Sequence, residues 1–333
     1  MIKKGVFIAV FLLVTVLTYG QDHAFSNKVN WHGYTQFRFS GNFDGNTTVS
    51  LRRLKFWMNS GPGFSKHWSF KVQGTFSSHF SEKFLLQDIK VGYRTGAFSF
   101  YFGQLIPAYS LEWFQHDFLL PVIERAKVID ALTPDGTLGV RDIGAQASYL
   151  SENKLLKISL GFFNGNGIKR YHFNNRGYML TNKTELDIPI NKSRLKLGYS
   201  LQYRKADQLK IPFVLPDTVA FSGNDFRYNF FLAFQTKNFN IQGEWLHASF
   251  NGSVAYGYYL LSWLTMKRNQ VVFSYEEYHD LIPQTVAHPT FRLGYDYMIK
   301  AYKIKLFFDN YCQFDSGKII NYTASLQFQF FFK

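Results

Sequence analysis

The feature that most constrains this chain is a period-two alternation of apolar and polar residues, which recurs from residue 29 to residue 332. In the C-terminal segment, Tyr322, Leu326 and Phe330 fall on one side of an extended strand, and Ser325 and Gln329 fall on the other. Residues 226–236 and 301–310 show the same pattern. Successive side chains of a strand point to opposite faces, so the pattern predicts strands with one apolar and one polar face.

We expect about sixteen such strands, each of roughly 8 to 12 residues and bounded by turn signals. The expected spans are 29–40, 48–59, 68–77, 85–94, 97–104, 144–150, 155–164, 179–189, 194–203, 226–236, 239–249, 254–264, 270–277, 290–299, 301–310 and 321–332.

The connections between these spans alternate in length. From the second connection onward, every even-numbered one is short, as at Thr95-Gly96 and Lys237-Asn238, whereas most odd-numbered ones are longer. The longer ones include 105–143, 165–178, 204–225, 278–289 and 311–320. Short turns on one rim and long loops on the other are typical of bacterial outer-membrane barrels. The sequence therefore predicts an all-β fold, a closed antiparallel transmembrane β-barrel of about sixteen strands with both termini on the short-turn, periplasmic side.

Composition distinguishes this barrel from a soluble β-sandwich. Aromatic residues make up 19% of the chain, with 37 Phe and 21 Tyr, and they are interleaved with polar residues. There is almost no amphipathic helix to cover so many apolar strand faces, which leaves lipid as the expected cover. The single cysteine, Cys312, excludes an intrachain disulfide framework. The nine histidines show no paired metal-ligand spacing, so we expect neither a metal nor a cofactor.

The N-terminus has the layout of a cleavable secretory signal. Lys3 and Lys4 precede an apolar run over 5–17, which is followed by small and polar residues. The run is too short to cross a bilayer as a helix, and the residue after the expected cleavage site is Gln21, not a lipid-modified cysteine. We therefore expect residues 1–20 to be removed and residues 21–333 to form a barrel in contact with outer-membrane lipid of a Gram-negative bacterium.

The chain is strongly basic, with a formal net charge of +14 that becomes about +12 without the signal. An exported chain rarely meets nucleic acid, and the basic residues are spread singly along the strands, so we expect no nucleic-acid partner. If the apolar faces contact lipid, the lumen receives Arg38, Arg53, Lys55, Lys71, Lys90, Arg94, Lys157, Lys183, Lys196, Arg227, Arg292, Lys303 and Lys305. The expected inward acids are Asp88, Glu185, Asp187, Glu244, Glu276, Asp296 and Asp309. This balance predicts a channel that prefers small anionic solutes, unless the basic residues merely hydrate the lumen or pair with these acids.

Several short motifs resemble the phosphate-selective porin O and P family of Gram-negative outer membranes. The segment over 103–144 reads Gly103-Gln104-Leu105-Ile106-Pro107, Ser110-Leu111-Glu112, Ile123-Glu124-Arg125, then Gly139, Arg141 and Gly144. Upstream, Leu51-Arg52-Arg53-Leu54-Lys55 is similar to the double-arginine second strand of that family, and residues 68–76 are similar to its third strand.

The resemblance implies a sixteen-stranded porin, a homotrimer, whose third loop over 105–143 folds inward to constrict the pore. It also implies roles for Arg52 in anion binding and for Glu112, His116, Glu124, Arg125 and Arg141 in the constriction loop. Members selective for phosphate carry a lysine in this loop, whereas Trp113 to Ile123 here contains only His116 and Asp117 as titratable groups.

Two other functions are consistent with the strand pattern. A barrel without transport activity could serve as a structural or secretion-linked scaffold, which predicts a lumen plugged by the loops over 105–143 and 204–225. A barrel phospholipase would need a serine and a histidine facing lipid, and His247 with Ser249 is the pair that the sequence offers.

Overall fold

The computed structural model describes residues 28–77, 83–133, 141–167, 176–211, 214–216, 218–281 and 289–332. The predicted secretory signal over 1–20 and the motif residue Gly139 lie outside these residues.

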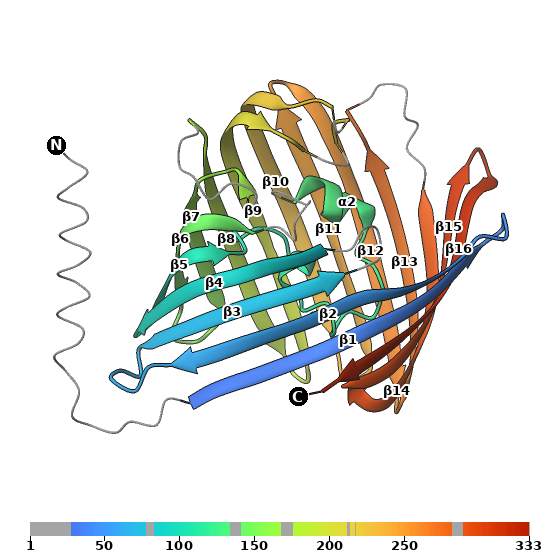
Figure 1. The fold of residues 1–333 in the computed structure, drawn as a ribbon, viewed down its shortest axis with the longest axis horizontal. Coiled ribbons are helices and arrows are strands. Elements are labelled where there is room, and N and C mark those ends of the chain that lie inside the picture. The colour runs from blue at the N-terminus through green and yellow to red at the C-terminus, as the bar shows by residue number, and fades with distance from the viewer. Residues whose placement is uncertain are drawn as a thin grey trace.

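Sixteen strands form one closed antiparallel barrel (Figure 1). In chain order they are β1 (Lys28–Asn42), β2 (Thr47–Gly61), β3 (Trp68–Ser77), β4 (Lys83–Thr95), β5 (Phe98–Leu105), β6 (Asp142–Leu150), β7 (Leu156–Phe163), β8 (Tyr178–Ile190), β9 (Ser193–Leu209), β10 (Phe221–Gln235), β11 (Phe239–Phe250), β12 (Ser253–Met266), β13 (Asn269–His279), β14 (Thr290–Tyr302), β15 (Ile304–Asp315) and β16 (Lys318–Phe331). The first strand pairs with the last, for example Gln36 with Gln329, so the sheet closes on itself. The predicted fold class is confirmed, and each predicted strand has its counterpart.

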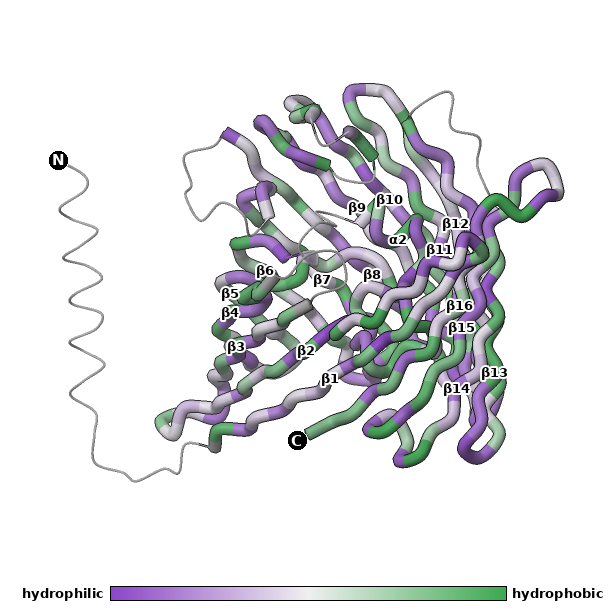
Figure 2. Tube along the Cα trace, turned by 45° about the vertical axis from the view of Figure 1, so that its right-hand side comes forward, coloured by the Kyte–Doolittle hydropathy of each residue, from purple (hydrophilic) through white to green (hydrophobic). Residues whose placement is uncertain are grey.

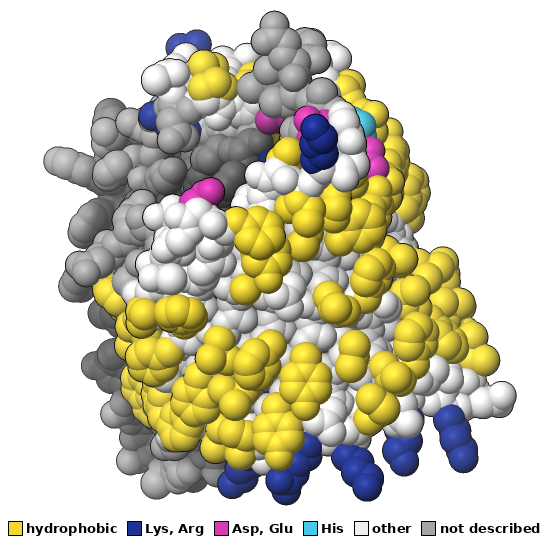
Figure 3. Space-filling model, turned by 90° about the vertical axis from the view of Figure 1, so that its right-hand side faces the viewer, with side chains coloured by type: hydrophobic (Ala, Val, Ile, Leu, Met, Phe, Trp, Pro, Cys, Tyr) yellow, Lys and Arg dark blue, Asp and Glu magenta, His cyan; other side chains and the backbone are white. Residues whose placement is uncertain are grey.

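The two faces of the strands separate as the alternation predicts. In β16, Gln327 and Gln329 are 1% and 0% exposed and face the interior, whereas Leu326 and Phe330 are 38% and 39% exposed on the outer surface. Hydrophilic and hydrophobic residues alternate along the strands in Figure 2, and Figure 3 shows apolar side chains gathered in a broad band across the face of the barrel in view. Such a band is the surface by which a barrel contacts lipid. Within the described ranges, no helix is long and apolar enough to cross a membrane.

Two connections differ from the prediction because the strands beside them are longer than expected. β9 continues to Leu209 and β10 begins at Phe221, which reduces the loop predicted over 204–225 to 210–220. The long loop predicted over 311–320 is wrong, since only Ser316 and Gly317 separate β15 from β16. Both residues have positive φ angles, 48° and 78°, as a tight hairpin turn between right-twisted strands requires.

The connection between β5 and β6, residues 106–141, folds into the barrel. Its described part contains a 3-10 helix, η1 (Glu112–Phe114), and a short α-helix, α2 (Lys127–Leu132), which lies inside the ring of strands in Figure 1. We call this segment the inner loop. The backbone of its residue Lys127, at the start of α2, donates a hydrogen bond to Glu276 of β13.

One side of the barrel interior is apolar. Ile129 and Leu132 of α2 pack with Leu246 of β11, Leu261 of β12 and Val272 of β13 in a single buried cluster. Side chains from the connection between β9 and β10 extend the same cluster. We call this cluster the apolar plug. Because it occupies the interior beside β11–β13, any water-filled path lies on the other side of the barrel.

Candidate functional site

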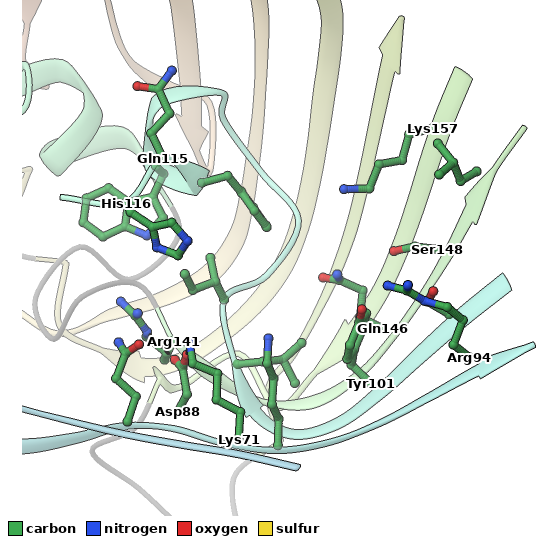
Figure 4. Close-up of a pocket in the computed structure, with 18 of the residues that line it drawn as sticks. Lys71, Asp88, Arg94, Tyr101, Gln115, His116, Arg141, Gln146, Ser148 and Lys157 are labelled. Atoms are coloured by element: carbon green, nitrogen blue, oxygen red, sulfur yellow. Dashed lines mark hydrogen bonds and ion pairs between the residues drawn. The ribbon is translucent and has the colours of Figure 1, made fainter. Parts of the chain in front are cut away.

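A cavity of about 840 Å³ lies between the inner loop and the wall formed by β2–β7, and we call it the channel cavity. In Figure 4, Gln115 and His116 of the inner loop lie on one side of an open space, and Tyr101, Gln146 and Lys157 of the wall lie on the other. The cavity lining also includes residues 96, 97 and 151, which belong to short turns, so the cavity reaches the short-turn rim.

Basic side chains outnumber acidic ones in the lining of the channel cavity. The basic residues are Lys55, Lys71, Lys90, Arg94, Arg125, Arg141, Lys154 and Lys157, and the acidic residues are Asp88, Asp117 and Glu152. The polar lining is completed by amides and hydroxyls such as those of Gln146 and Ser148. A lining of this kind gives the cavity a positive potential.

Five of the predicted pore-lining residues border this cavity: Lys55, Lys71, Lys90, Arg94 and Lys157. Lys90 and Arg94 form no ion pair with any described residue. The Nζ atom of Lys90 lies 5.0 Å from the centre of the Tyr101 ring, a contact that leaves its charge uncompensated. These two side chains are therefore the best-placed anion contacts in the wall.

Four other cations of the cavity share two carboxylates. Lys71 and Arg141 both contact Asp88, with nitrogen–oxygen distances of 2.7 and 2.9 Å. Lys55 and Arg125 contact Asp117 at 2.6 and 2.8 Å. Since each carboxylate faces more than one cation, each group keeps a net positive charge. The predicted loop residue Arg141 thus belongs to the cavity wall, where it is fixed by Asp88.

Asp117 and Glu124 anchor the inner loop to β1 and β2. Glu124 receives hydrogen bonds from Arg38 Nη1 at 2.6 Å and, in bidentate fashion, from Arg52 at 2.6 and 2.7 Å. Arg53 lies 3.3 Å from Asp117. Burial alone would raise the pKa of each carboxyl, but the neighbouring guanidinium and ammonium charges outweigh it and hold both pKa values well below their usual range. Both acids are therefore ionised near neutral pH.

A β-bulge explains how two consecutive arginines reach the interior. The pairing of β1 with β2 shifts register between Gln36, opposite Arg53, and Phe37, opposite Leu51, so Arg52 is the extra residue. Strict alternation would have pointed Arg52 or Arg53 towards lipid. The bulge points both inward, and Glu124 and Asp117 of the inner loop bind them.

The remaining predicted pore-lining residues are not part of the channel cavity. Arg227 is fully buried against Asp225, and Lys305 is buried at 2.7 Å from Asp296. Arg292 is buried, lies 3.5 Å from Asp309 and donates a hydrogen bond to the backbone carbonyl of Glu124. The prediction that Lys303 lines the lumen is wrong, because this residue lies exposed in the turn between β14 and β15. The pairing of inward bases with inward acids, kept open from the sequence, applies to these buried residues.

Glu112 and Arg125 organise the inner loop from within. Arg125 donates to the backbone carbonyls of Glu112 and Gln115 at 2.6 and 2.8 Å, and its guanidinium lies 4.8 Å from the centre of the Trp113 ring. Glu124 and Arg125 thus act separately: the first binds the wall and the second braces the loop. Glu112 is almost fully buried, and burial, reinforced by the nearby Glu244, raises its pKa to about 7 although Arg125 opposes the shift.

Glu244 of β11 is an anchor that the sequence interpretation counted only as a lumen acid. Its carboxylate accepts hydrogen bonds from the backbone of Leu111 and Glu112, at 2.9 and 2.7 Å, and from the hydroxyls of Ser110 and Tyr259. The contact holds the beginning of the inner loop against the wall opposite its origin. The signal available in the sequence was a carboxylate within a strand whose later inward residues, Leu246, Ala248 and Phe250, are apolar.

Aromatic rings line the channel cavity between Asp117 and the barrel wall. Trp57 of β2 and Phe118 are nearly parallel, with centroids 6.1 Å apart, and Phe118 stacks in turn on His116 at 5.1 Å. Burial holds the pKa of His116 below its usual value, so this predicted loop residue is uncharged at neutral pH. The three rings together form one side of the cavity.

The structure does not support the phospholipase pair that the sequence offers. His247 and Ser249 project from the outer side of β11, where His247 stacks on Tyr228 at 4.6 Å, and the described hydrogen bonds include none between the two. Among the described residues, no three His, Cys, Asp or Glu side chains are grouped as a metal site.

No protein-family model matches the sequence, and no curated protein matches it either. The fold, however, is shared with solved outer-membrane structures. A structure of Pseudomonas putida OprB at high pH matches with a TM-score of 0.65 and 11% identity, covering 91% of this chain and 94% of that one. OmpTdeltaL8, a loop L8 deletion mutant of the outer membrane protein OmpT of Vibrio cholerae, matches with a TM-score of 0.63 and 10% identity, covering 92% and 100%. A mutant of Rh. blastica porin matches with a TM-score of 0.62 and 10% identity, covering 92% and 100%.

At this identity the matches establish the barrel architecture alone. They agree with the broader part of the family resemblance, a porin-type barrel. The chain has the fold of bacterial outer-membrane porins.

Proposed function

We propose that this protein is an outer-membrane porin of a Gram-negative bacterium that lets small hydrophilic solutes diffuse passively, with a preference for anions. The observation that carries the proposal is the channel cavity, whose lining holds eight basic and three acidic side chains. Positive groups in a low-dielectric wall concentrate anions and repel cations, and salt weakens the effect as the Debye length shortens to about 10 Å at 0.1 M.

Within this channel, Lys90 and Arg94 are proposed to meet the anion directly. Arg94 offers a planar fork to an oxyanion, and Lys90 offers a mobile point charge. Phosphate and similar oxyanions fit this pair by their charge. Because the stretch from Trp113 to Ile123 contains no lysine, the contacts in this chain would come from the wall and not from the inner loop.

The proposed setting is a homotrimer with both termini in the periplasm. The even number of strands places the barrel's two ends on the short-turn rim, which is the periplasmic rim in bacterial barrels. One solved neighbour is described as a trimer form of OmpT, at 10% identity. Chemical cross-linking of the purified protein in mild detergent tests the trimer, and a single monomeric band would contradict it.

Planar-bilayer recording under a salt gradient tests the channel. We expect stable openings with an anion-directed reversal potential, and the double variant K90E/R94E should lower the anion-to-cation permeability ratio about threefold or more. The matched control is K318E, at an exposed residue of β16 on the opposite rim.

The outcomes separate the alternatives. Inserted protein without conductance would overturn the channel and favour a non-conducting scaffold, for which the apolar plug is the supporting observation. Conductance with an unchanged permeability ratio in K90E/R94E would contradict the role of these two residues. Release of fatty acid from phospholipid by the purified protein would favour the phospholipase.

A further inference from the structure

Most of the exposed positive charge among the described residues lies at one rim of this barrel. The short turns between β8 and β15, together with the strand ends beside them, carry Lys192, Lys237, Lys267, Arg268, Lys300 and Lys303, and all six side chains are exposed. We call these residues the basic rim. No Asp or Glu occurs in the turns that hold these cations, at 191–192, 236–238, 267–268 and 303. Figure 3 shows Lys and Arg side chains along the edge immediately below the outer apolar band.

The opposite rim carries fewer exposed cations, and those described there are Arg176, Lys205, Lys210 and Lys318. Its three fully described short connections, 43–46, 251–252 and 316–317, contain no Lys or Arg, and the first contains Asp44. Some inward cations are neutralised by a carboxylate, as with Lys305 and Asp296. None of the six basic-rim side chains forms an ion pair with a described residue. The uncompensated charge of the basic rim therefore faces an environment outside the protein.

The position of these cations identifies that environment. Ile190 precedes the turn that holds Lys192, Phe239 follows Lys237, and Met266 precedes Lys267. The three apolar side chains are 44%, 41% and 49% exposed on the outer surface. A cation so close to a lipid-facing apolar side chain reaches the level of the lipid headgroups while its aliphatic stem stays against the acyl chains.

We propose that the basic rim binds anionic phospholipid headgroups, such as phosphatidylglycerol, in the membrane leaflet that meets the short turns. The attraction is electrostatic and acts from several turns at once, so the barrel gathers acidic lipids around β8–β15. This inference depends on the membrane placement of the barrel and does not depend on conductance. A non-conducting barrel would bind the same lipids, so failure of the channel proposal leaves it standing.

Native mass spectrometry of the purified barrel in neutral detergent, titrated with phosphatidylglycerol or with phosphatidylcholine of identical acyl chains, tests the proposal. We expect the wild-type barrel to bind phosphatidylglycerol with an apparent Kd about fivefold or more below that for phosphatidylcholine at low salt. The preference should shrink at 0.5 M salt, where the Debye length falls to about 4 Å. The variant K267E/R268E/K303E should lose the preference.

The matched control reverses three exposed lysines near the opposite rim, K205E/K210E/K318E, and should keep the preference. Because a charge reversal can impair folding, K267Q/R268Q/K303Q is measured in parallel, and only preparations with β-barrel circular dichroism are compared. Equal binding of the two lipids by the wild type, or equal loss of preference in the control, would overturn the proposal. Binding of the wild type to an acidic protein or polymer, together with no preference between the two lipids, would also overturn the proposal.

Discussion

Glu112 shows how a single proton can set the strength with which the inner loop is held. Its side chain lies 4.0 Å from Arg125, and its backbone N–H is bound by Glu244. Burial and Glu244 both disfavour the ionised form, and the pKa of Glu112 rises from 4.5 to about 7. An acid whose pKa is raised on docking stabilises the docked state fully below its ordinary pKa, and this contribution is lost as the pH rises through the raised value.

We therefore expect the inner loop to loosen between pH 5 and pH 8, by up to about 3 kcal/mol of docking free energy. Protease cleavage of the folded barrel within the loop should accelerate over this window, and E112Q, which cannot ionise, should remove most of the acceleration. E152Q, at an exposed residue of a short turn, is the control and should behave like the wild type. The same pH profile in E112Q as in the wild type would assign the loosening to another group.

At the residue scale, alternation alone predicts which side chains face inward but not what they meet there. It places Lys90 and Arg227 on the same inner face, yet the first lines the cavity and the second is buried against Asp225. The difference arises from the path of the inner loop, which only tertiary packing determines. Alternation could not predict the inward position of Arg52 either, because a β-bulge breaks the alternation at that point.

At the scale of elements, α2 is held mainly by apolar contact. The helix is only six residues long, too short to be stable alone, and Leu132 at its end is completely buried. It contacts β11, β12 and β13. Packing of this kind makes α2 a fixed part of the barrel interior.

Truncation of Leu132 to alanine should weaken this docking by about 2 to 5 kcal/mol through lost burial and the cavity left behind. We expect current noise and loop cleavage to increase while the barrel remains folded. L160A removes a leucine that is 57% exposed to lipid on β7 and should leave both measurements near wild type. Unchanged current noise in L132A would show that polar anchors such as Glu244 are sufficient to hold the inner loop in place.

The elements themselves were the most predictable part of the structure. Period two and alternating turn lengths located all the strands, because both follow directly from barrel geometry. The apolar plug was missed although a signal existed: β12 is apolar on both faces, with Leu260 pointing outward and Tyr259 and Leu261 inward. An inner face of that kind needs an apolar cover, and α2 supplies it.

At the scale of the whole molecule, the strand pairings of the barrel wall do not involve the inner loop. Each of the sixteen strand pairings lies outside residues 106–141. Replacement of residues 107–140 by a short Gly-Ser linker should therefore leave a closed barrel with higher conductance. The thermal midpoint should fall, because Leu246, Leu261 and Val272 lose their cover.

Single-channel conductance and the temperature at which the barrel unfolds on a denaturing gel check this expectation. A variant that inserts with wild-type conductance would contradict the constricting role of the inner loop. A variant that cannot form a barrel would show that the loop is required for folding.

The contact between the first and last strands has a consequence for the order of folding. Gln36 and Gln329 meet across this seam although 293 positions separate them, and on the inside the seam is touched by the inner loop: Gln329 donates to the carbonyl of Phe118, and Arg38 bridges Glu124 and Gln327. Closing a connection that long is the slowest kind of contact for a chain to make. The inner loop contacts both edge strands, so it can hold the two edges of the sheet near each other while the seam forms. We therefore expect the inner loop to speed the closure of the seam without being required for the closed barrel.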